Sequence, residues 1–257
     1  MSSDVALLGS QIRYEQKSYW RNPGAAFFTF AFPLVFFFIL VGVAGGGHDA
    51  SILGKGVKLA QYYTPSILAY AVMSACFLSI SLNLVRQREF GILKRMHGTP
   101  LPSWAFIGGV IGNAVIVATL LSVVCVTFAI LVYGVSLPAS HIPALVVTIA
   151  LAALAFCALG IAVSSLIPNL DSGPAIVNLP YFVLVFISGT YFPISGTMAK
   201  IANWLPLRPF IVAMYKSFNP FTTGSAWAPH QLLHLVIWGV IGTVFAVRNF
   251  RWTPRRG

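Results

Sequence analysis

The chain has 257 residues, of which 58% are hydrophobic and only 8% are charged, and its formal net charge is +11. A soluble domain averages about 45–50% apolar and about 25% charged residues, so this composition excludes an ordinary soluble protein. In a soluble domain such a charge would indicate nucleic-acid binding, but the loops of membrane proteins also carry excess lysine and arginine. We therefore expect an all-α polytopic membrane protein, with residues 1–257 forming a single transmembrane domain and with no nucleic acid as a partner.

Residues 4–22 predict an amphipathic helix ahead of the first membrane span. At about 100° per residue, one arc of this helix holds apolar and aromatic side chains, namely Val5, Leu8, Ile12, Tyr19 and Trp20. Three cations spaced by four residues, Arg13, Lys17 and Arg21, form a basic stripe beside that arc. Such a helix lies in the membrane interface, with Trp20 at headgroup level and the cations toward anionic lipids. A helix that is only solvated is the alternative.

Six apolar stretches predict transmembrane helices, at about residues 25–44, 65–85, 104–133, 142–167, 174–192 and 230–247. A helix needs about 20 apolar residues to cross the hydrocarbon core, and it satisfies its backbone polar groups internally, as lipid requires. A turn with two prolines, Pro138 and Pro143, separates the third stretch from the fourth. The first stretch is longer than the apolar run of about 7–15 residues in a cleaved signal peptide, so we expect a retained span.

The segment 86–100, between the second and third spans, concentrates charge in a chain that has little. Five charged residues fall within ten positions, namely Arg86, Arg88, Glu89, Lys94 and Arg95. Phe90, Leu93 and Met96 form an apolar row on a short predicted helix, which the sequence Gly98-Thr99-Pro100 ends. An ordinary basic loop explains the cations. It does not require Glu89 or the apolar row, and these features favour docking to a partner protein.

Residues 193–221, before the last span, predict two short helices on the outer side. Ser195 is a plausible N-cap, and four apolar residues follow at helical spacing, namely Met198, Ile201, Ala202 and Leu205. Pro206 and Pro209 interrupt the pattern before a second helix over residues 210–218. Each piece is too short to cross, so we expect re-entrant or interfacial helices over the outer mouth of the bundle. A plain outer loop is the alternative.

The distribution of lysine and arginine predicts the orientation. Cytoplasmic segments of membrane proteins carry the excess of these cations. With the N-terminus in the cytoplasm, eleven of the 16 fall inside, namely Arg13, Lys17, Arg21, Arg86, Arg88, Lys94, Arg95, Arg248, Arg251, Arg255 and Arg256. The other five fall outside, namely Lys55, Lys58, Lys200, Arg208 and Lys216. We therefore expect a multi-pass protein of the plasma (inner) membrane with both termini in the cytoplasm.

The segment 86–100 resembles the signature of ABC-2 type permeases, the membrane subunits of one class of ATP-driven exporters. The matching residues are Glu89, Gly91, Leu93, Lys94, Arg95, Thr99 and Pro100. The six spans, the N-terminal helix and the outer helical segment also match the family, whereas Met96-His97-Gly98 departs from it. The resemblance implies a coupling helix that docks to a separate ATPase subunit through Arg88, Glu89, Gly91, Leu93, Lys94, Arg95 and Thr99. In this reading Glu89 pairs with a cation of the ATPase and Leu93 fills a groove on it.

The resemblance also implies the assembly and the transport path. Two permease subunits, identical or different, work with two ATPase subunits, and those subunits bind ATP and Mg²⁺, so this chain needs no cofactor of its own. Spans one and five meet their counterparts across the dimer axis, which makes Phe30, Phe37, Asn178, Tyr181 and Phe186 candidates for the path, although ordinary packing also explains them. An apolar, aromatic path suits multidrug efflux or lipid export. A polysaccharide or glycolipid exporter is the alternative.

Other classes of protein fit the sequence less well. The chain has no phosphate-binding loop, since Gly54-Lys55-Gly56 lacks the required flanking residues. No Asp, Glu, Lys or Arg lies near the middle of a span, which disfavours an ion-coupled secondary transporter. His230 and His234 have metal-ligand spacing but no nearby carboxylate, and no nucleophile elbow occurs. We expect no catalytic residues and no metal, and interpret the cysteines, Cys76, Cys125 and Cys157, as small apolar residues.

Overall fold

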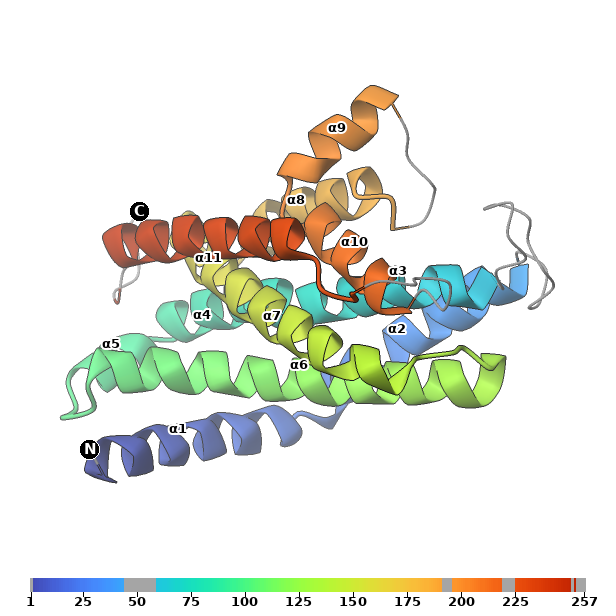
Figure 1. The fold of residues 1–257 in the computed structure, drawn as a ribbon. Coiled ribbons are helices and arrows are strands. Elements are labelled where there is room, and N and C mark those ends of the chain that lie inside the picture. Colours follow the sequence, from blue (N-terminus) through green and yellow to red (C-terminus); the bar gives the residue numbers. More distant parts are fainter. Residues whose placement is uncertain (1, 44–58, 191–195, 219–224, 251, 253–257) are drawn as a thin grey trace.

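A computed structural model describes residues 2–43, 59–190, 196–218, 225–250 and 252 of the chain. Within these ranges the regular structure is entirely helical, as the sequence predicts (Figure 1). The long helices form a bundle with two ends. We call one the α5 end, where α5 (Ile92–His97) lies, α6 (Ser103–Tyr133) begins and α11 (Pro229–Asn249) finishes. The opposite end, near α10 (Leu207–Phe218), is the α10 end.

The first two helices, α1 (Ser2–Trp20) and α2 (Pro23–Val43), are separated by a short break. The Asn22 side chain accepts a hydrogen bond of 3.3 Å from the backbone N–H of Ala25, and Pro23 occupies the first position of α2. Both are standard ways to begin a helix. A separate helix therefore occurs where one was predicted over residues 4–22, starting and ending two residues earlier, and its position in the membrane interface stays a prediction.

The second predicted span belongs to a continuous rod of 31 residues, Leu59–Glu89. It comprises α3 (Leu59–Met73), the π-helical segment η2 (Ser74–Leu78) and α4 (Ser79–Glu89). The rod lies at the centre of the bundle, because 72% of its most apolar window is buried. It approaches α7 (Ile142–Ser164) closely. The Ser81 hydroxyl donates toward the carbonyl oxygens of Phe77, at 2.7 Å, and Gly160, at 2.9 Å.

Glycine at position 160 makes this approach possible. A Cβ atom there would lie 2.9 Å from the backbone oxygen of Phe77, which is too short for a van der Waals contact. Close backbone contact of this kind is typical of helix pairs in membranes. The three cysteines are buried and free, and Cys76 and Cys157 belong to the hydrophobic core around this contact.

Five helices are long and apolar enough to cross a membrane within the described residues: Pro23–Gly42, Leu59–Glu89, Ser103–Tyr133, Ala139–Ser164 and Pro229–Asn249. The predicted span at 174–192 corresponds to α8 (Gly173–Ile187), which has 15 residues. At 1.5 Å per residue it covers about 22 Å, less than the hydrocarbon core of about 30 Å. Residues 191–192 of that predicted span lie outside the described residues. The structure therefore supports five spans and a shorter apolar helix, and the count of six is not confirmed.

Segment 193–221, which was predicted to lie on the outer side, contains α9 (Gly196–Trp204) and α10. Most of α10 is buried, and it packs against α3, α7 and α11. In contrast, α9 projects from the bundle (Figure 1), and Met198, Ile201 and Trp204 are exposed. Two helices thus occur where two were predicted, but the predicted apolar row on the first is only partly covered. The predicted N-cap Ser195 lies outside the described residues, as do Lys55 and Lys58, which were predicted to face the outer side.

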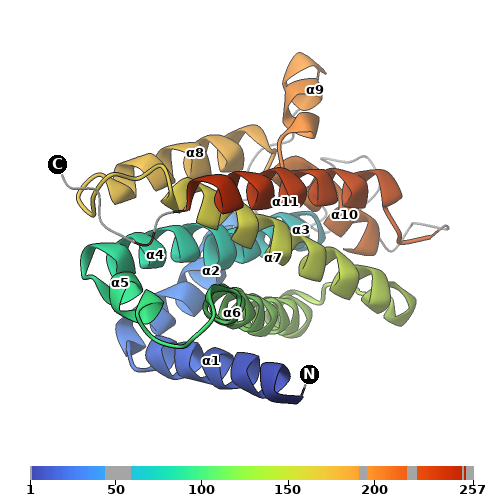
Figure 2. The ribbon, with the colours of Figure 1, turned by 90° about the vertical axis from the view of Figure 1, so that its left-hand side faces the viewer.

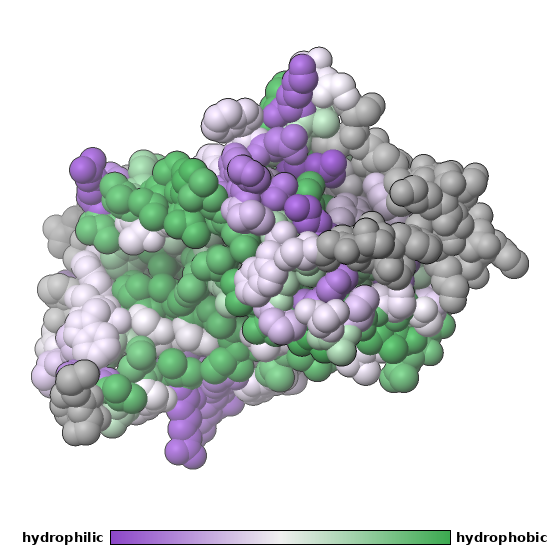
Figure 3. All heavy atoms as spheres, in the orientation of Figure 1, coloured by the Kyte–Doolittle hydropathy of each residue, from purple (hydrophilic) through white to green (hydrophobic). Residues whose placement is uncertain are grey.

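A broad apolar surface lies over α11 and its neighbours (Figure 3). Its exposed members on α11 are Leu233, Val236, Ile237, Val240, Ile241, Val244, Phe245 and Val247. Hydrophilic residues gather instead toward α9 and along α1 in the same view. An exposed apolar face of this extent is stable in lipid but not in water, so the surface itself indicates a membrane protein.

Candidate docking, pocket and transport sites

Segment 86–100 is divided into two helical pieces by a turn at Phe90-Gly91. The rod continues through Arg86 and Arg88 and ends only at Glu89. Gly91 then adopts a left-handed conformation, with φ of 67°, which glycine accepts without strain. After this turn α5 has six residues. The single helix that was predicted is therefore two pieces, the end of the rod and the short α5. In Figure 2, α5 lies at an angle to the rod, on an edge of the molecule between α4 and α1.

Arg88 lies inside the protein. Its side chain is 3% exposed, and its guanidinium donates hydrogen bonds to the carbonyl oxygens of Ser164, at 3.2 Å, and Ile167. Ser164 is the last residue of α7 and Ile167 follows shortly after it, at a place where a helix leaves carbonyl acceptors unsatisfied and favours a positive charge. Glu89 approaches Arg88 with 3.8 Å between Oε1 and Nε. Arg88 was predicted to belong to the docking set, but its side chain lies inside the chain and its charge is directed at these carbonyl oxygens rather than at the surface.

Leu93 is also turned inward. It is fully buried and belongs to the hydrophobic core, so the expectation that it fills a groove on a partner does not fit this arrangement. The exposed residues of the turn and of α5 are Phe90, Ile92, Lys94 and Arg95, which we call the α5 surface. Thr99 finishes α5 by donating a hydrogen bond of 2.6 Å to the Met96 carbonyl oxygen. The predicted apolar row of Phe90, Leu93 and Met96 is therefore divided: Leu93 is buried, Met96 is half-buried, and Phe90 lies in the turn before α5 and is exposed.

The N-terminal helix packs against a glycine-rich stretch of α6. A Cβ atom at Gly109 would lie 2.3 Å from the side chain of Gln11, and one at Gly112 would lie 2.7 Å from Ile12. The Gln16 amide also donates a hydrogen bond of 3.3 Å to the Asn113 carbonyl oxygen. Part of the predicted apolar arc of α1 therefore contacts protein. The missing glycine side chains are what allow the two helices to approach so closely.

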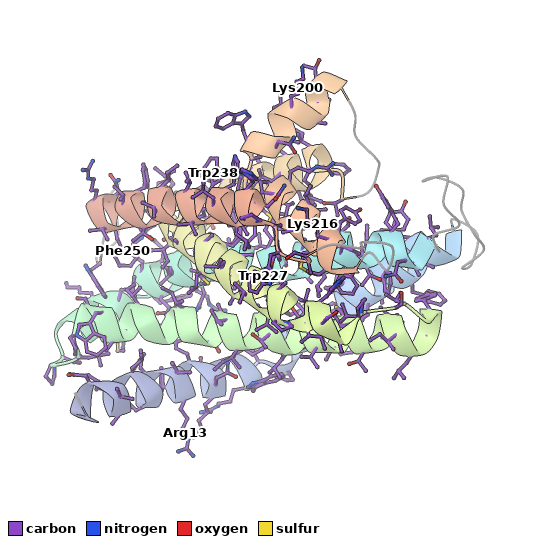
Figure 4. The ribbon with its side chains drawn as sticks, in the orientation of Figure 1. Arg13, Lys200, Lys216, Trp227, Trp238 and Phe250 are labelled. Atoms are coloured by element: carbon purple, nitrogen blue, oxygen red, sulfur yellow. The ribbon has the colours of Figure 1, made fainter. Side chains whose placement is uncertain are left out.

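The predicted basic stripe of α1 faces away from the bundle. Arg13, Lys17 and Arg21 are exposed, and Arg13 projects outward from the bundle in Figure 4. Trp20 is 48% exposed, stacks on Phe30 with 5.9 Å between ring centroids, and donates a hydrogen bond of 2.9 Å from its indole to Gln16. These positions are compatible with the predicted contact to headgroups, which stays a prediction.

A pocket of about 350 Å³ lies between α1, α4, α5 and α6 at the α5 end. Its lining combines polar and apolar side chains: Tyr14, Glu15, Ser18, Asn22, Asn83, Arg86, Gln87, Phe90, Ile92, Met96 and Phe106. Glu15 is only 5% exposed, and burial raises the pKa of its carboxyl above the ordinary value. The Gln87 Oε1 atom is buried without a hydrogen-bond partner among the described residues. Neither the pocket nor Glu15 was predicted.

The candidate path residues do not gather at one place within the chain. Phe37 is buried against Phe128 and Tyr133, whereas Phe186 is 61% exposed on α8. Asn178 is half-buried, and Tyr181 is buried. An additional residue links the two predicted spans. Tyr70 of α3 lies 6.3 Å from Phe36 of α2 and 5.8 Å from Tyr181 of α8 between ring centroids.

The path candidates were taken from the first and fifth predicted spans, and Tyr70 was missed because it lies in the second. A tyrosine within an apolar span was the available signal. Glu15 was missed because its helix was assigned wholly to the membrane surface, although an acid between Arg13 and Lys17 was an available signal.

His230 and His234 lie on adjacent turns of α11, and His234 Nδ1 lies 2.8 Å from the His230 carbonyl oxygen. No group of three or more potential metal ligands occurs among the residues that the structure describes.

The fold defines a multi-span helical membrane protein with a short exposed helix at the α5 end. The family model described as ABC-2 type transporter matches residues 7–219, and the chain belongs to this family of membrane transport proteins. A relative from Bacillus subtilis (strain 168), named "Putative transport permease YvfS", is 23% identical over 208 residues. The match covers 79% of this chain and 82% of the relative. The family resemblance of segment 86–100 is thereby confirmed.

Proposed function

We propose that this chain is the permease subunit of an ATP-driven exporter, and that it moves a lipophilic drug or lipid-like substrate out of the cell. A separate ATPase subunit supplies the energy and binds ATP and Mg²⁺. The single observation that carries this proposal is the α5 surface, on a chain of the ABC-2 type transporter family. There Phe90 and Ile92 are exposed beside Lys94 and Arg95. Apolar groups rimmed by charge are typical of a protein-binding patch.

The inward residues of the same segment would transmit motion. Leu93 anchors α5 in the core, and Arg88 joins the end of the rod to the end of α7. A partner that pushes on Phe90 or Lys94 would therefore move α5 together with the α3–η2–α4 rod and α7. That rod reaches the α10 end, where Gln61 donates a hydrogen bond to the carbonyl oxygen of Ser136 at 2.8 Å and to that of Phe218. Rigid packed elements of this kind can carry a coupling between distant sites.

A second permease subunit would cover the face formed by α2 and α8. Exposed apolar residues on this face include Phe28, Phe32 and Phe38 of α2 with Leu179, Phe182 and Phe186 of α8. Tyr70 lies between these helices and contacts both through Phe36 and Tyr181. An aromatic, apolar seam between two subunits would suit a lipophilic substrate. Both termini would lie in the cytoplasm, because the α5 end carries a cluster of cations, namely Arg86, Arg88, Lys94, Arg95 and Arg248, among the described residues.

The test is reconstitution with and without an ATPase partner. We expect the purified chain alone to turn over no ATP, and the chain co-expressed with its ATPase to co-purify with it and to show substrate-stimulated hydrolysis. Phe90→Ala and Lys94→Glu should weaken co-purification while leaving the melting temperature unchanged. Leu120→Ala, on the exposed apolar face of α6, is the matched control. Robust ATP turnover by the isolated chain, or normal assembly in both α5 variants, would contradict the proposal.

A further inference from the structure

The pocket at the α5 end is lined by the carboxyl group of Glu15, a buried residue that has no partner within the described part of the chain. Glu15 is 5% exposed, and it forms no hydrogen bond or ion pair with the described residues. A buried charge of this kind is costly unless an opposite charge or several donors compensate it. The amide next to it in the sequence does not compensate this charge. The neighbouring Gln16 is committed to Asn113 and Trp20.

The other residues that line the pocket indicate which chemical class of ligand it can bind. Tyr14, Met96 and Phe106 supply apolar and aromatic surface, while Asn83 and Gln87 supply amide groups beside Glu15. The Gln87 Oε1 atom is a second acceptor without a partner in the described structure. Two acceptors next to aromatic rings are suited to a protonated amine, which donates hydrogen bonds and is attracted to aromatic faces. An anion would be repelled by Glu15, and a neutral apolar ligand would leave both acceptors unsatisfied.

Size and charge exclude two simpler occupants. A metal ion needs several ligands, and no group of three or more potential ligands occurs within the described residues. The head of a single lysine or arginine would fill only a small part of about 350 Å³. That volume lies at the lower end of the range for small-molecule pockets, about 300–1,000 Å³. Arg86 lines the same pocket but is exposed, with its guanidinium 5.8 Å from the centre of the Phe90 ring.

We propose that this pocket binds a small amphipathic cation, with the ammonium group at Glu15 and Gln87 and the apolar body against Tyr14, Met96 and Phe106. The α1 helix forms one wall, and its exposed basic stripe lies on the outer side of that wall. Ile92 and Met96 of α5 line the pocket, so a bound ligand would contact the helix that carries the proposed docking surface. This binding site goes beyond the proposed function, because the binding itself requires neither ATP nor a partner.

The experiment measures binding to the full-length chain in nanodiscs of phosphatidylcholine, without nucleotide. The probe is dansylcadaverine, a fluorescent primary amine, and the comparison compound is its N-acetylated form, which is neutral. We expect saturable binding of the amine and at least about tenfold weaker binding of the acetylated compound, since a hydrogen bond to a charged group is worth about 1.5–3 kcal/mol. Glu15→Gln should weaken amine binding by a similar factor.

One further variant and two controls keep the test independent of any effect of Glu15→Gln on folding. Ser18→Arg places a competing guanidinium one turn from Glu15 in the pocket wall and should also weaken amine binding at least about tenfold. Asp4→Asn and Ser10→Arg make the same charge changes on α1 outside the pocket and should bind like wild type. Equal binding of both compounds, normal binding by Glu15→Gln and Ser18→Arg, or equal losses in the control variants would overturn the proposal. So would complete displacement of the probe by a docked ATPase, which would assign the pocket to a basic side chain of that partner.

Discussion

The guanidinium of Arg88 donates a hydrogen bond of 3.2 Å to the carbonyl oxygen of Ser164, and so joins the end of α4 to the end of α7. A second bond from the same side chain reaches Ile167. The two helices are 76 residues apart in sequence at this contact. The most basic segment of the chain therefore contains one cation that stabilises the bundle and others that stay on its surface.

Arg88→Ala should destabilise the chain. The substitution removes a buried cation and leaves the Ser164 and Ile167 carbonyls without their donor. Each lost hydrogen bond to a charged group is worth about 1.5–3 kcal/mol, so we expect a clearly lower melting temperature in detergent. Lys94→Ala, which removes an exposed cation six residues later, is the control and should melt like wild type. A wild-type melting temperature for Arg88→Ala would mean that the contact to α7 contributes little.

Leu93→Ala should lower the stability of the chain, whereas Ile92→Ala should weaken binding of the ATPase, although the two residues are neighbours. Leu93 is fully buried, so its truncation should cost about 2–5 kcal/mol of stability by leaving a cavity. Ile92 is 37% exposed, so its truncation should leave the melting temperature nearly unchanged and reduce only co-purification of the ATPase. Melting curves and pull-down yields of both variants separate these effects. The reverse pattern would show that α5 presents its other face.

Gly109→Leu should detach α1 from α6. Even a Cβ atom at position 109 would lie 2.3 Å from Gln11, and 3.3 Å from the backbone of that residue, so a larger side chain has no room. Trypsin should then cleave faster after Arg13 and Lys17. Gly9→Leu is the control, because a Cβ atom there meets nothing within 4 Å. Equal cleavage rates in Gly109→Leu and wild type would indicate that α1 is held by other contacts.

Lowering the pH should stabilise the folded chain through Glu15. Burial raises the pKa of this carboxyl above its ordinary value of 4.5, so the folded state binds the proton more tightly than the unfolded state. The free energy of unfolding is then greatest below about that value and falls as the pH rises through the raised pKa.

Glu15→Gln should flatten this pH dependence and raise the melting temperature at neutral pH. Melting temperatures of wild type, Glu15→Gln and Asp4→Asn across acidic and neutral buffers measure the effect. Asp4 is exposed on the same helix and serves as the reference for other carboxyl groups. A wild-type pH profile in Glu15→Gln would show that another group causes the dependence.

Labelling of single cysteines should establish the orientation. In a background without Cys76, Cys125 and Cys157, cysteine replaces Lys200 of α9 or Lys94 of α5, both of which are exposed. We expect an impermeant thiol reagent to label position 200 in intact cells and position 94 only after the cells are opened. Labelling of position 94 in intact cells would reverse the predicted topology.

The sequence by itself determined the class of the protein and most of its helices. Apolar runs of about 20 residues without charge can only be stable as helices in lipid, and the predicted spans at 25–44, 104–133 and 230–247 agree closely with α2, α6 and α11. Segment 86–100 also carried enough of the family pattern to identify the family. These conclusions depend on local composition and spacing, which are fully present in the sequence.

Only the tertiary structure decided which way the side chains of the short segments point. Nothing in the local sequence distinguishes Leu93 and Arg88 from exposed residues of the same types. Contacts with distant helices bury both side chains. The same holds for Glu15, which is buried because α1 packs on Gly108, Gly109 and Gly112 of α6 rather than lying free on a surface. Helical periodicity defines a face, whereas the partner of that face depends on residues far away in the chain. For this reason the pocket beside α5 could not be read from the sequence.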